Sequence, residues 1–182
     1  LSGGVTTVVT GPGSANIIGG EMAALKTHGI VVDEMLVSFP AGLKAALGEN
    51  PKRSYGANKK MPATRMAAAA LLREAFTRAQ NYIKKEAEEK DLKMEALARV
   101  LRGDVPLRVH AHRADDIMTA VRIAGEFGIR LVIEHCTEGH LVAGQLAAKG
   151  VAAVVGPIIT NRAKVEMQGV SLKTAAELAE AG

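Results

Sequence analysis

The last third of the chain alternates short apolar runs with segments of helical periodicity, and this regularity constrains the fold more than any other feature. Three runs predict strands, over residues 105–109, 129–133 and 151–155. The segments between and after them predict helices, over residues 114–127, 138–149 and 172–181. Because the strand runs are apolar throughout rather than alternating, both of their faces must be covered. Repeated strand–helix units of this kind indicate a parallel α/β sheet.

The first two thirds of the chain supply the remaining elements. Residues 4–10 are β-branched almost throughout, which predicts a buried strand. We also predict a helix over residues 18–29, a strand over 30–36, a strand or helical turn over 42–48, and a basic loop over 50–56. The Ala-rich pattern from Pro62 to about Arg102 predicts two helices, because most globular helices are shorter than this segment.

The six candidate strands fit two architectures, a doubly wound sheet and six of the eight units of a (β/α)8 barrel. The periodicity leaves this choice open. The sequence does argue against a nucleotide-binding domain, because no Gly-x-Gly-x-x-Gly motif follows the first predicted strand. The length of 182 residues suits one domain that spans residues 1–182.

Composition narrows the range of partners and compartments. Aromatic residues make up only 3% of the chain and the net charge is +4, with the basic residues dispersed, so we expect no nucleic-acid partner. The longest apolar run, residues 151–159, is about half of what a bilayer span requires, so we expect no membrane partner. The single cysteine, Cys136, suits a reducing compartment, and we expect a cytoplasmic location.

Histidines stand at the ends of two consecutive predicted strands. His110 and His112 end the first, and His135 ends the next. Neighbouring strand ends lie about 5 Å apart, so two of these imidazoles could share one divalent metal. His110 and His112 point to opposite sides if the strand continues, and both can bind only if it ends at Ala111. The alternative is a metal-free α/β module that binds a small molecule and whose histidines are structural.

Other residue types near the strand ends widen the candidate site. Glu49 could add an oxygen ligand, and a desolvated Lys44 could become carbamylated and serve as an anionic ligand instead. A charged surface loop explains either residue equally well. Cys136 follows His135, but no activating glycine-rich turn surrounds it, so we predict a small buried hydrophobe rather than a nucleophile.

Taken together, these motifs resemble the metal-dependent amidohydrolase superfamily, in particular its imidazolonepropionase-like branch. The resemblance covers nearly the whole chain and is carried by four segments: GGVTTV at residues 3–8, GLKAALGENPKR at 42–53, PLRVHAH at 106–112 and IEH at 133–135. It implies a (β/α)8 barrel with one or two metal ions, zinc before iron or manganese. It further implies that His110 and His135 are metal ligands, that Glu49 rather than Lys44 is the strand-four ligand, and that His112 and Arg113 line the substrate pocket.

The chain departs from this family pattern at both ends. The strand-one His-x-His of the family would precede Leu1, and its strand-eight Asp would follow Gly182. The resemblance therefore implies an α/β fold that is a partial TIM barrel, strands two to seven without strands one and eight. The parent enzyme would hydrolyse a C–N bond in a non-peptide amide or a dipeptide, with metal-activated water and a small-molecule substrate. We expect the 182-residue chain to be inactive alone and to form homo-oligomers through its exposed edges.

Overall fold

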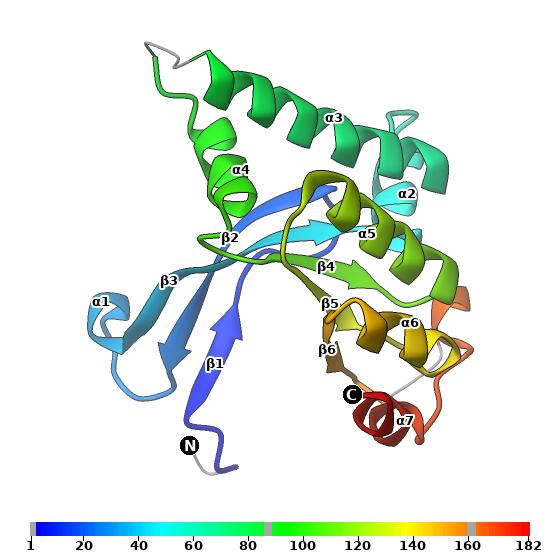
Figure 1. Ribbon diagram of the computed structural model, residues 1–182. Coiled ribbons are helices and arrows are strands. Elements are labelled where there is room, and N and C mark those ends of the chain that lie inside the picture. Colours follow the sequence, from blue (N-terminus) through cyan, green and yellow to red (C-terminus); the bar gives the residue numbers. More distant parts are fainter. Residues whose placement is uncertain (1–2, 86–88, 160–162) are drawn as a thin grey trace.

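The computed structural model describes residues 3–85, 89–159 and 163–182, and a curled six-stranded sheet forms its centre (Figure 1). The strands follow one another in chain order: β1 (Thr7–Thr10), β2 (Ile18–Lys26), β3 (Leu36–Ala46), β4 (Leu107–Ala111), β5 (Leu131–His135) and β6 (Ala152–Val155). The pairs from β3 to β6 are parallel. With helices in the connections between these strands, the architecture confirms the prediction of a partial TIM barrel.

Nine helical segments accompany the sheet in the described part of the chain: α1 (Val32–Met35), α2 (Glu49–Gly56), α3 (Arg65–Lys84), α4 (Leu92–Arg102), α5 (Ala114–Phe127), η1 (Gly139–Val142), α6 (Ala143–Ala148), η2 (Val165–Met167) and α7 (Thr174–Ala181). The two helices predicted between Pro62 and Arg102 are α3 and α4, and the helix predicted over residues 114–127 is α5. Thr64 and Asp91 accept hydrogen bonds from the first-turn amides of α3 and α4, which explains where these helices begin.

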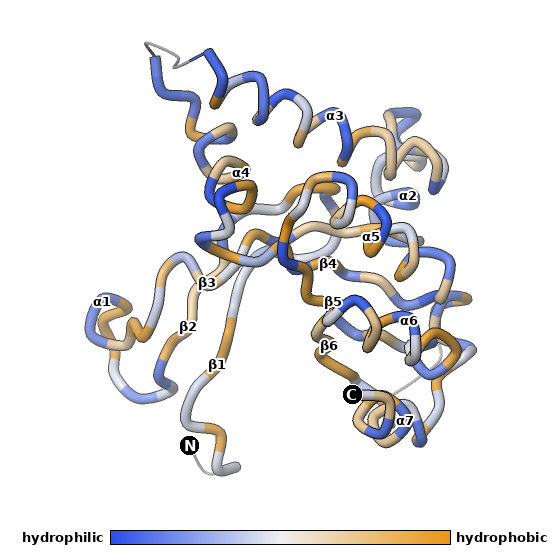
Figure 2. Tube along the Cα trace, viewed as in Figure 1, coloured by the Kyte–Doolittle hydropathy of each residue, from blue (hydrophilic) through white to orange (hydrophobic). Residues whose placement is uncertain are grey.

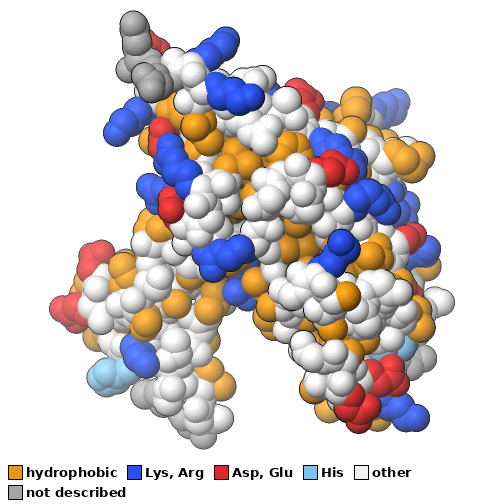
Figure 3. Space-filling view, in the orientation of Figure 1, with side chains coloured by type: hydrophobic (Ala, Val, Ile, Leu, Met, Phe, Trp, Pro, Cys, Tyr) orange, Lys and Arg blue, Asp and Glu red, His pale blue; other side chains and the backbone are white. Residues whose placement is uncertain are grey.

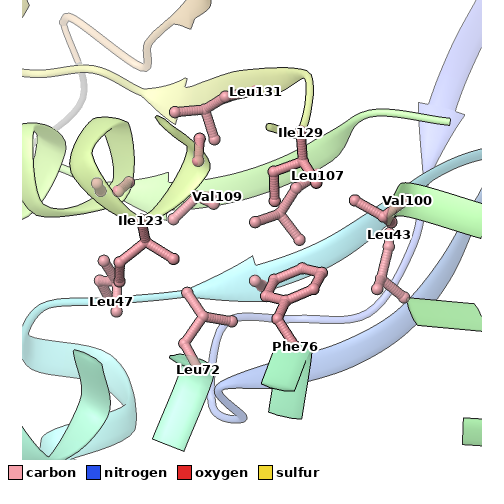
Figure 4. Packing of buried hydrophobic residues seen from close by; sticks show 14 of the residues in the cluster. Leu43, Leu47, Leu72, Phe76, Val100, Leu107, Val109, Ile123, Ile129 and Leu131 are labelled. Atoms are coloured by element: carbon pink, nitrogen blue, oxygen red, sulfur yellow. The ribbon is translucent and has the colours of Figure 1, made fainter. Parts of the chain in front are cut away.

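The core lies between the parallel strands and the helices α3, α4 and α5. Leu43, Leu107 and Leu131 face this core from three neighbouring strands, and Leu72 and Phe76 pack against them from α3 (Figure 4). The intervening strand residues point to the opposite, concave face of the sheet, because side chains alternate along a strand. That face is polar and carries four charged or imidazole side chains: Lys44, Arg108, His110 and Glu134.

The sheet is not parallel throughout, and this corrects the prediction from the apolar runs. β1 pairs antiparallel with β2, and β2 pairs antiparallel with β3. The helix predicted over residues 18–29 is wrong, because this segment is the strand β2. Gly19 and Gly20 weaken a helix at its start, and the long pairing with β3 outweighs the helical propensity of the alanines that follow.

Three further local predictions are wrong. The strand predicted over residues 4–10 forms as β1 over its second half, but it is exposed rather than buried, because no helix covers it. The strand predicted over residues 30–36 is a turn and the short helix α1, and its apolar side chains are exposed rather than buried. The basic loop predicted over residues 50–56 is the helix α2, in which Pro51 occupies the first turn and removes no internal hydrogen bond. Residues 42–46, which fit either a strand or a helical turn, belong to β3, an 11-residue strand.

A projecting β arm, defined as residues 5–10 and 23–39, extends from the barrel strands (Figure 1). Its surface carries exposed apolar side chains, and Figure 2 shows hydrophobic stretches along β1 and beside α1. In the space-filling view, a hollow separates the arm from the part that carries β6 and α7 (Figure 3). None of the described helices combines the length and the apolar character that crossing a membrane requires.

Candidate metal centre

Three histidines converge at the carboxyl ends of β4 and β5. His110, His112 and His135 each offer a ring nitrogen, and these three atoms lie within 4.8 Å of one another. The ring centroids are 4.6 to 4.7 Å apart. The carboxyl ends of parallel strands form the active-site face of a barrel, so the cluster occupies the expected position.

The end of β4 explains why His110 and His112 face the same site. β4 ends at Ala111, which is the condition under which the sequence allowed both side chains to converge. At the end of β5 the backbone also leaves strand geometry. His135 and Cys136 have φ values of 72° and 45°, a region that residues other than glycine rarely adopt. Such conformations concentrate at functional sites, where the surrounding structure holds them in place.

Hydrogen bonds orient the imidazoles of His135 and His112 through their Nδ1 atoms. The Nδ1–H of His135 donates to the carbonyl oxygen of Gly156 at 2.7 Å. Because a carbonyl only accepts, Nδ1 carries the proton and Nε2 keeps a free lone pair. The Nδ1 of His112 shares a 2.7 Å hydrogen bond with the hydroxyl of Thr137. Partners of this kind typically orient metal-binding histidines.

A buried carboxylate, Glu166 of η2, adjoins the cluster. Its side chain is 1% exposed, and its Oε2 accepts a 2.8 Å hydrogen bond from the Glu49 backbone N–H. Its Oε1 lies 3.6 Å from Nε2 of His110 and 3.8 Å from Nε2 of His112. Sequence reasoning missed this residue. The one signal for it is its place in the segment that follows the last predicted strand, where a side chain can reach the same end of the sheet as the histidines.

The electrostatics of the cluster favour neutral His110 and His112 beside an ionised carboxylate. Burial lowers the pKa of His110 and of His112, although the nearby Glu166 charge opposes this shift. Burial alone would raise the pKa of the Glu166 carboxyl, but the His110 ring and the Glu49 amide outweigh burial and lower it. Metal binding requires deprotonated ligands, so this is the protonation state in which an ion binds most readily.

The donor set fits a divalent transition metal. Two buried atoms, His110 Nδ1 and Glu166 Oε1, have no hydrogen-bond partner among the residues that the structure describes. Buried polar atoms are rarely left unpaired, and an ion beside Glu166 Oε1 would account for that oxygen. Imidazole nitrogens and a carboxylate oxygen are ligands that zinc and related metals take in proteins.

Comparison with known proteins identifies the family. No protein-family model matches the chain. The structure matches the crystal structure of an amidohydrolase from Thermotoga maritima with a TM-score of 0.97 and 49% sequence identity, over 99% of this chain and 49% of that one. The chain belongs to the amidohydrolase superfamily. A curated relative, amidohydrolase tasK of Hapsidospora irregularis, is 30% identical over 171 residues, which make up 78% of this chain and 17% of that protein.

These matches confirm the resemblance to amidohydrolases that the sequence motifs indicated. The chain spans about half the length of the solved amidohydrolase and 17% of the length of the curated one.

Glu49 and Lys44, the two candidates for the ligand that the family takes from its fourth barrel strand, lie at different depths in this partial barrel. Glu49 begins α2, and its carboxylate lies 3.8 Å from Arg53. It is the Glu49 backbone amide that contacts Glu166. Lys44 is buried on β3, and its Nζ donates to the carbonyl of Ala45 at 3.2 Å. Burial lowers the pKa of Lys44 to about 8, despite the opposing charge of Glu134.

Four other candidate residues, Arg113, Cys136, His28 and His140, have surroundings that differ from those of the histidine cluster. Arg113 lines a cavity of about 580 Å³ next to α2 and pairs with Asp115 at 2.9 Å. Cys136 is buried, and burial raises the pKa of its thiol to about 11, so it is protonated at neutral pH. His28 is exposed, and His140 shares a 3.0 Å hydrogen bond with Thr174.

Proposed function

We propose that this chain carries part of the metal centre of an amidohydrolase that cleaves a C–N bond in a small molecule. The substrate class we propose is a non-peptide amide or a dipeptide, in line with the imidazolonepropionase-like motifs. The observation that carries this proposal is the convergence of three ring nitrogens, from His110, His112 and His135, within 4.8 Å at the carboxyl ends of β4 and β5. Family membership supports the same conclusion.

In this proposal His110 and His135 hold the ion, as the family resemblance implies. The geometry adds His112 as a third donor, in place of the substrate contact predicted for it. Arg113, on the wall of the neighbouring cavity, is proposed to contact the substrate. Glu49 remains the proposed strand-four ligand, with Lys44 as its alternative. When bound, a divalent ion, zinc before iron or manganese, supplies a Lewis acid and an activated water for attack on a carbonyl.

The residues of the chain prepare the site for this chemistry. The Gly156 carbonyl holds the proton of His135 on Nδ1, so that Nε2 can coordinate. Burial keeps His110 and His112 neutral, which removes competition from protons. The protonated thiol of Cys136 offers no thiolate to compete for the metal or the substrate.

We also propose that the 182-residue chain has little activity by itself and self-associates. Half of the solved amidohydrolase has no counterpart in it, so substrate-binding residues are expected to be missing. The sheet has two edge strands, β1 and β6, and all four residues of β1 are exposed. Unpaired edges favour pairing with another copy. Light scattering during gel filtration would then show a dimer or larger species.

A free, buried cysteine suits the cytoplasm, where we place the protein.

The metal content of the purified chain tests the main proposal. The chain is purified without chelators, supplied with zinc, desalted and subjected to elemental analysis, beside the double variant His110→Ala/His135→Ala. We expect about one zinc per chain and a loss of nearly all of it in the double variant. His28→Ala, which removes an exposed histidine, serves as the control and should retain the metal.

Circular dichroism establishes that each variant is folded before its metal content is compared. An unchanged chain that binds no metal, or a double variant that binds as much as the unchanged chain, would contradict the proposal. The first result would instead favour a metal-free binding module with structural histidines.

A further inference from the structure

Among the carboxylates that the structure describes, Glu166 stands apart because it is buried against two histidines and one of its oxygens has no hydrogen-bond partner. It comes from the turn η2, after β6, and reaches across to the loop between β3 and α2. We propose that Glu166 is a further protein donor of the metal centre beside the three histidines, with Oε1 as the ligand atom and Oε2 as its anchor. This inference rests on the proposed metal centre and adds a ligand to it.

The distances around Oε1 suit a shared ion better than a hydrogen bond. Oε1 lies 3.6 Å from His110 Nε2 and 3.8 Å from His112 Nε2. Nitrogen–oxygen hydrogen bonds are about 2.7–3.2 Å long, so neither contact is one. Two donors on one tetrahedral ion, each about 2.0–2.1 Å from it, lie about 3.4 Å apart. The observed separations are close to this value.

No protein group in the described part of the chain donates a hydrogen bond to Glu166 Oε1. The Lys164 ammonium lies 3.8 Å away and donates a 2.6 Å hydrogen bond to Asn50 Oδ1 instead. Asn50 in turn donates from Nδ2 to His110 Nε2 at 3.1 Å. An ion on Nε2 would take the place of this last contact. A cation held between Oε1 and the imidazoles would compensate the buried charge.

The backbone around Glu166 is shaped to hold a carboxylate. Gly48 has a φ of 85°, and a Cβ on it would lie 2.7 Å from Glu166 Oε2. The lack of a side chain at Gly48 therefore makes room for the carboxylate. The Glu49 N–H then fixes Oε2 at 2.8 Å. With one oxygen fixed by a backbone amide, the other is directed at the histidines, an arrangement typical of metal-binding carboxylates.

The test compares zinc affinity in the unchanged full chain and in three variants, Glu166→Gln, Glu138→Gln and His135→Ala. Glu166→Gln keeps the size of the side chain and an oxygen for the Glu49 amide, but it loses the charge. Glu138→Gln is the matched control, because Glu138 also accepts a 2.8 Å hydrogen bond from a backbone amide, that of Ala114. Competition with a chromophoric chelator measures the zinc Kd, and the visible absorption of bound cobalt reports the ligand set. We expect Glu166→Gln to weaken zinc binding by about tenfold or more and to change the cobalt spectrum, with Glu138→Gln unchanged.

Each outcome separates this inference from the proposed function. If Glu166→Gln binds zinc as tightly as the unchanged chain while His135→Ala loses it, Glu166 only anchors the loop, and the inference is overturned while the metal centre stands. If the unchanged chain binds no zinc, both are overturned. If Glu166→Gln does not fold, Glu166→Asp replaces it, because it keeps the charge but shortens the reach. An unchanged zinc Kd in Glu166→Asp would then overturn the inference.

Discussion

The two halves of β3 show how differently one strand can be used. Its first residues belong to the β arm and are exposed, whereas its last five are buried. Leu36 is 45% exposed, and Leu43, seven residues later, is 1% exposed. Both halves are paired to neighbouring strands, so backbone hydrogen bonding does not distinguish them. What differs is that Leu43, in the second half, packs in the core with Phe76 of α3, Val100 of α4 and Ile123 of α5 (Figure 4), whereas the first six residues of the strand include no buried one.

This difference explains where the candidate metal centre lies. The concave face at the covered end of the sheet carries His110, which lies beside Ala46 of β3. A metal centre needs ligands held in place by their surroundings, and packed surroundings provide this restraint. The β arm also consists of paired strands but has no covering layer, and its described residues contribute no member of the histidine cluster. Burial by the helices, and not the formation of a sheet, therefore makes a site at this position.

Truncating one leucine in each half of β3 should give the largest difference in the free energy of unfolding. Leu43→Ala removes a core side chain and leaves a cavity, so we expect it to lower the free energy of unfolding by about 2–5 kcal/mol. Leu36→Ala removes the same atoms from an exposed position and should lower it by less than about 1 kcal/mol. Urea unfolding measures both values. Equal losses would contradict the view that the two halves differ in packing.

A smaller effect is expected at the loop that follows the covered half of β3. Gly48→Ala places a Cβ at a φ of 85° and 2.7 Å from Glu166 Oε2, so we expect a loss of about 2–4 kcal/mol. Gly103→Ala is the control. Gly103 has a φ of 81°, but a Cβ there meets nothing within 4 Å, so only the backbone strain of about 1 kcal/mol remains. Thermal unfolding of both variants would expose the difference, and similar losses would show that the carboxylate does not fill the space at Gly48.

The smallest predicted effect concerns the charge on the covered half of β3. Burial lowers the pKa of Lys44 to about 8, so between pH 8 and about 10.4 the unfolded chain binds more protons than the folded one. Stability should therefore rise with pH in this window, and below pH 8 the buried charge destabilises the fold. Lys44→Met should stabilise the chain by about 2 kcal/mol at pH 7, with a smaller gain at pH 10.

Lys26→Met, on the exposed end of β2, is the control for this substitution. Its effect should be small, because this side chain is exposed. Urea unfolding at pH 7 and pH 10 measures both variants. A gain for Lys44→Met that does not shrink toward pH 10 would show that the pKa of Lys44 is not lowered by burial.

The fold was predictable where local signals and tertiary packing agree. Apolar runs and amphipathic helices after residue 62 predicted α3 to α7 and β4 to β6, because each helix there covers the strands beside it. The prediction failed from residue 18 to residue 36, where the alanines of β2 favour a helix and the apolar residues of α1 suggest a buried strand. Pairing with β3 decides the first case, and the lack of a covering layer decides the second. Neither can be seen in a local pattern.

The site was predictable to the extent that its residues stand at strand ends. His110 and His135 follow from that rule, and the role of His112 depended on the end of β4, which only the structure fixes. The sequence did not predict Glu166 as a site residue, because its position depends on contacts with Gly48 and Glu49, more than a hundred residues earlier in the chain.

X-ray absorption spectroscopy of the zinc-loaded chain tests the central claim most directly, because it reports the ligands of the ion without reference to activity. We expect nitrogen and oxygen donors at about 2.0–2.1 Å, with the outer-shell scattering of imidazole rings, and a loss of the imidazole signal in His110→Ala/His135→Ala. A sulfur donor at about 2.3 Å, or a spectrum without imidazole scattering, would contradict a metal centre built from His110, His112 and His135.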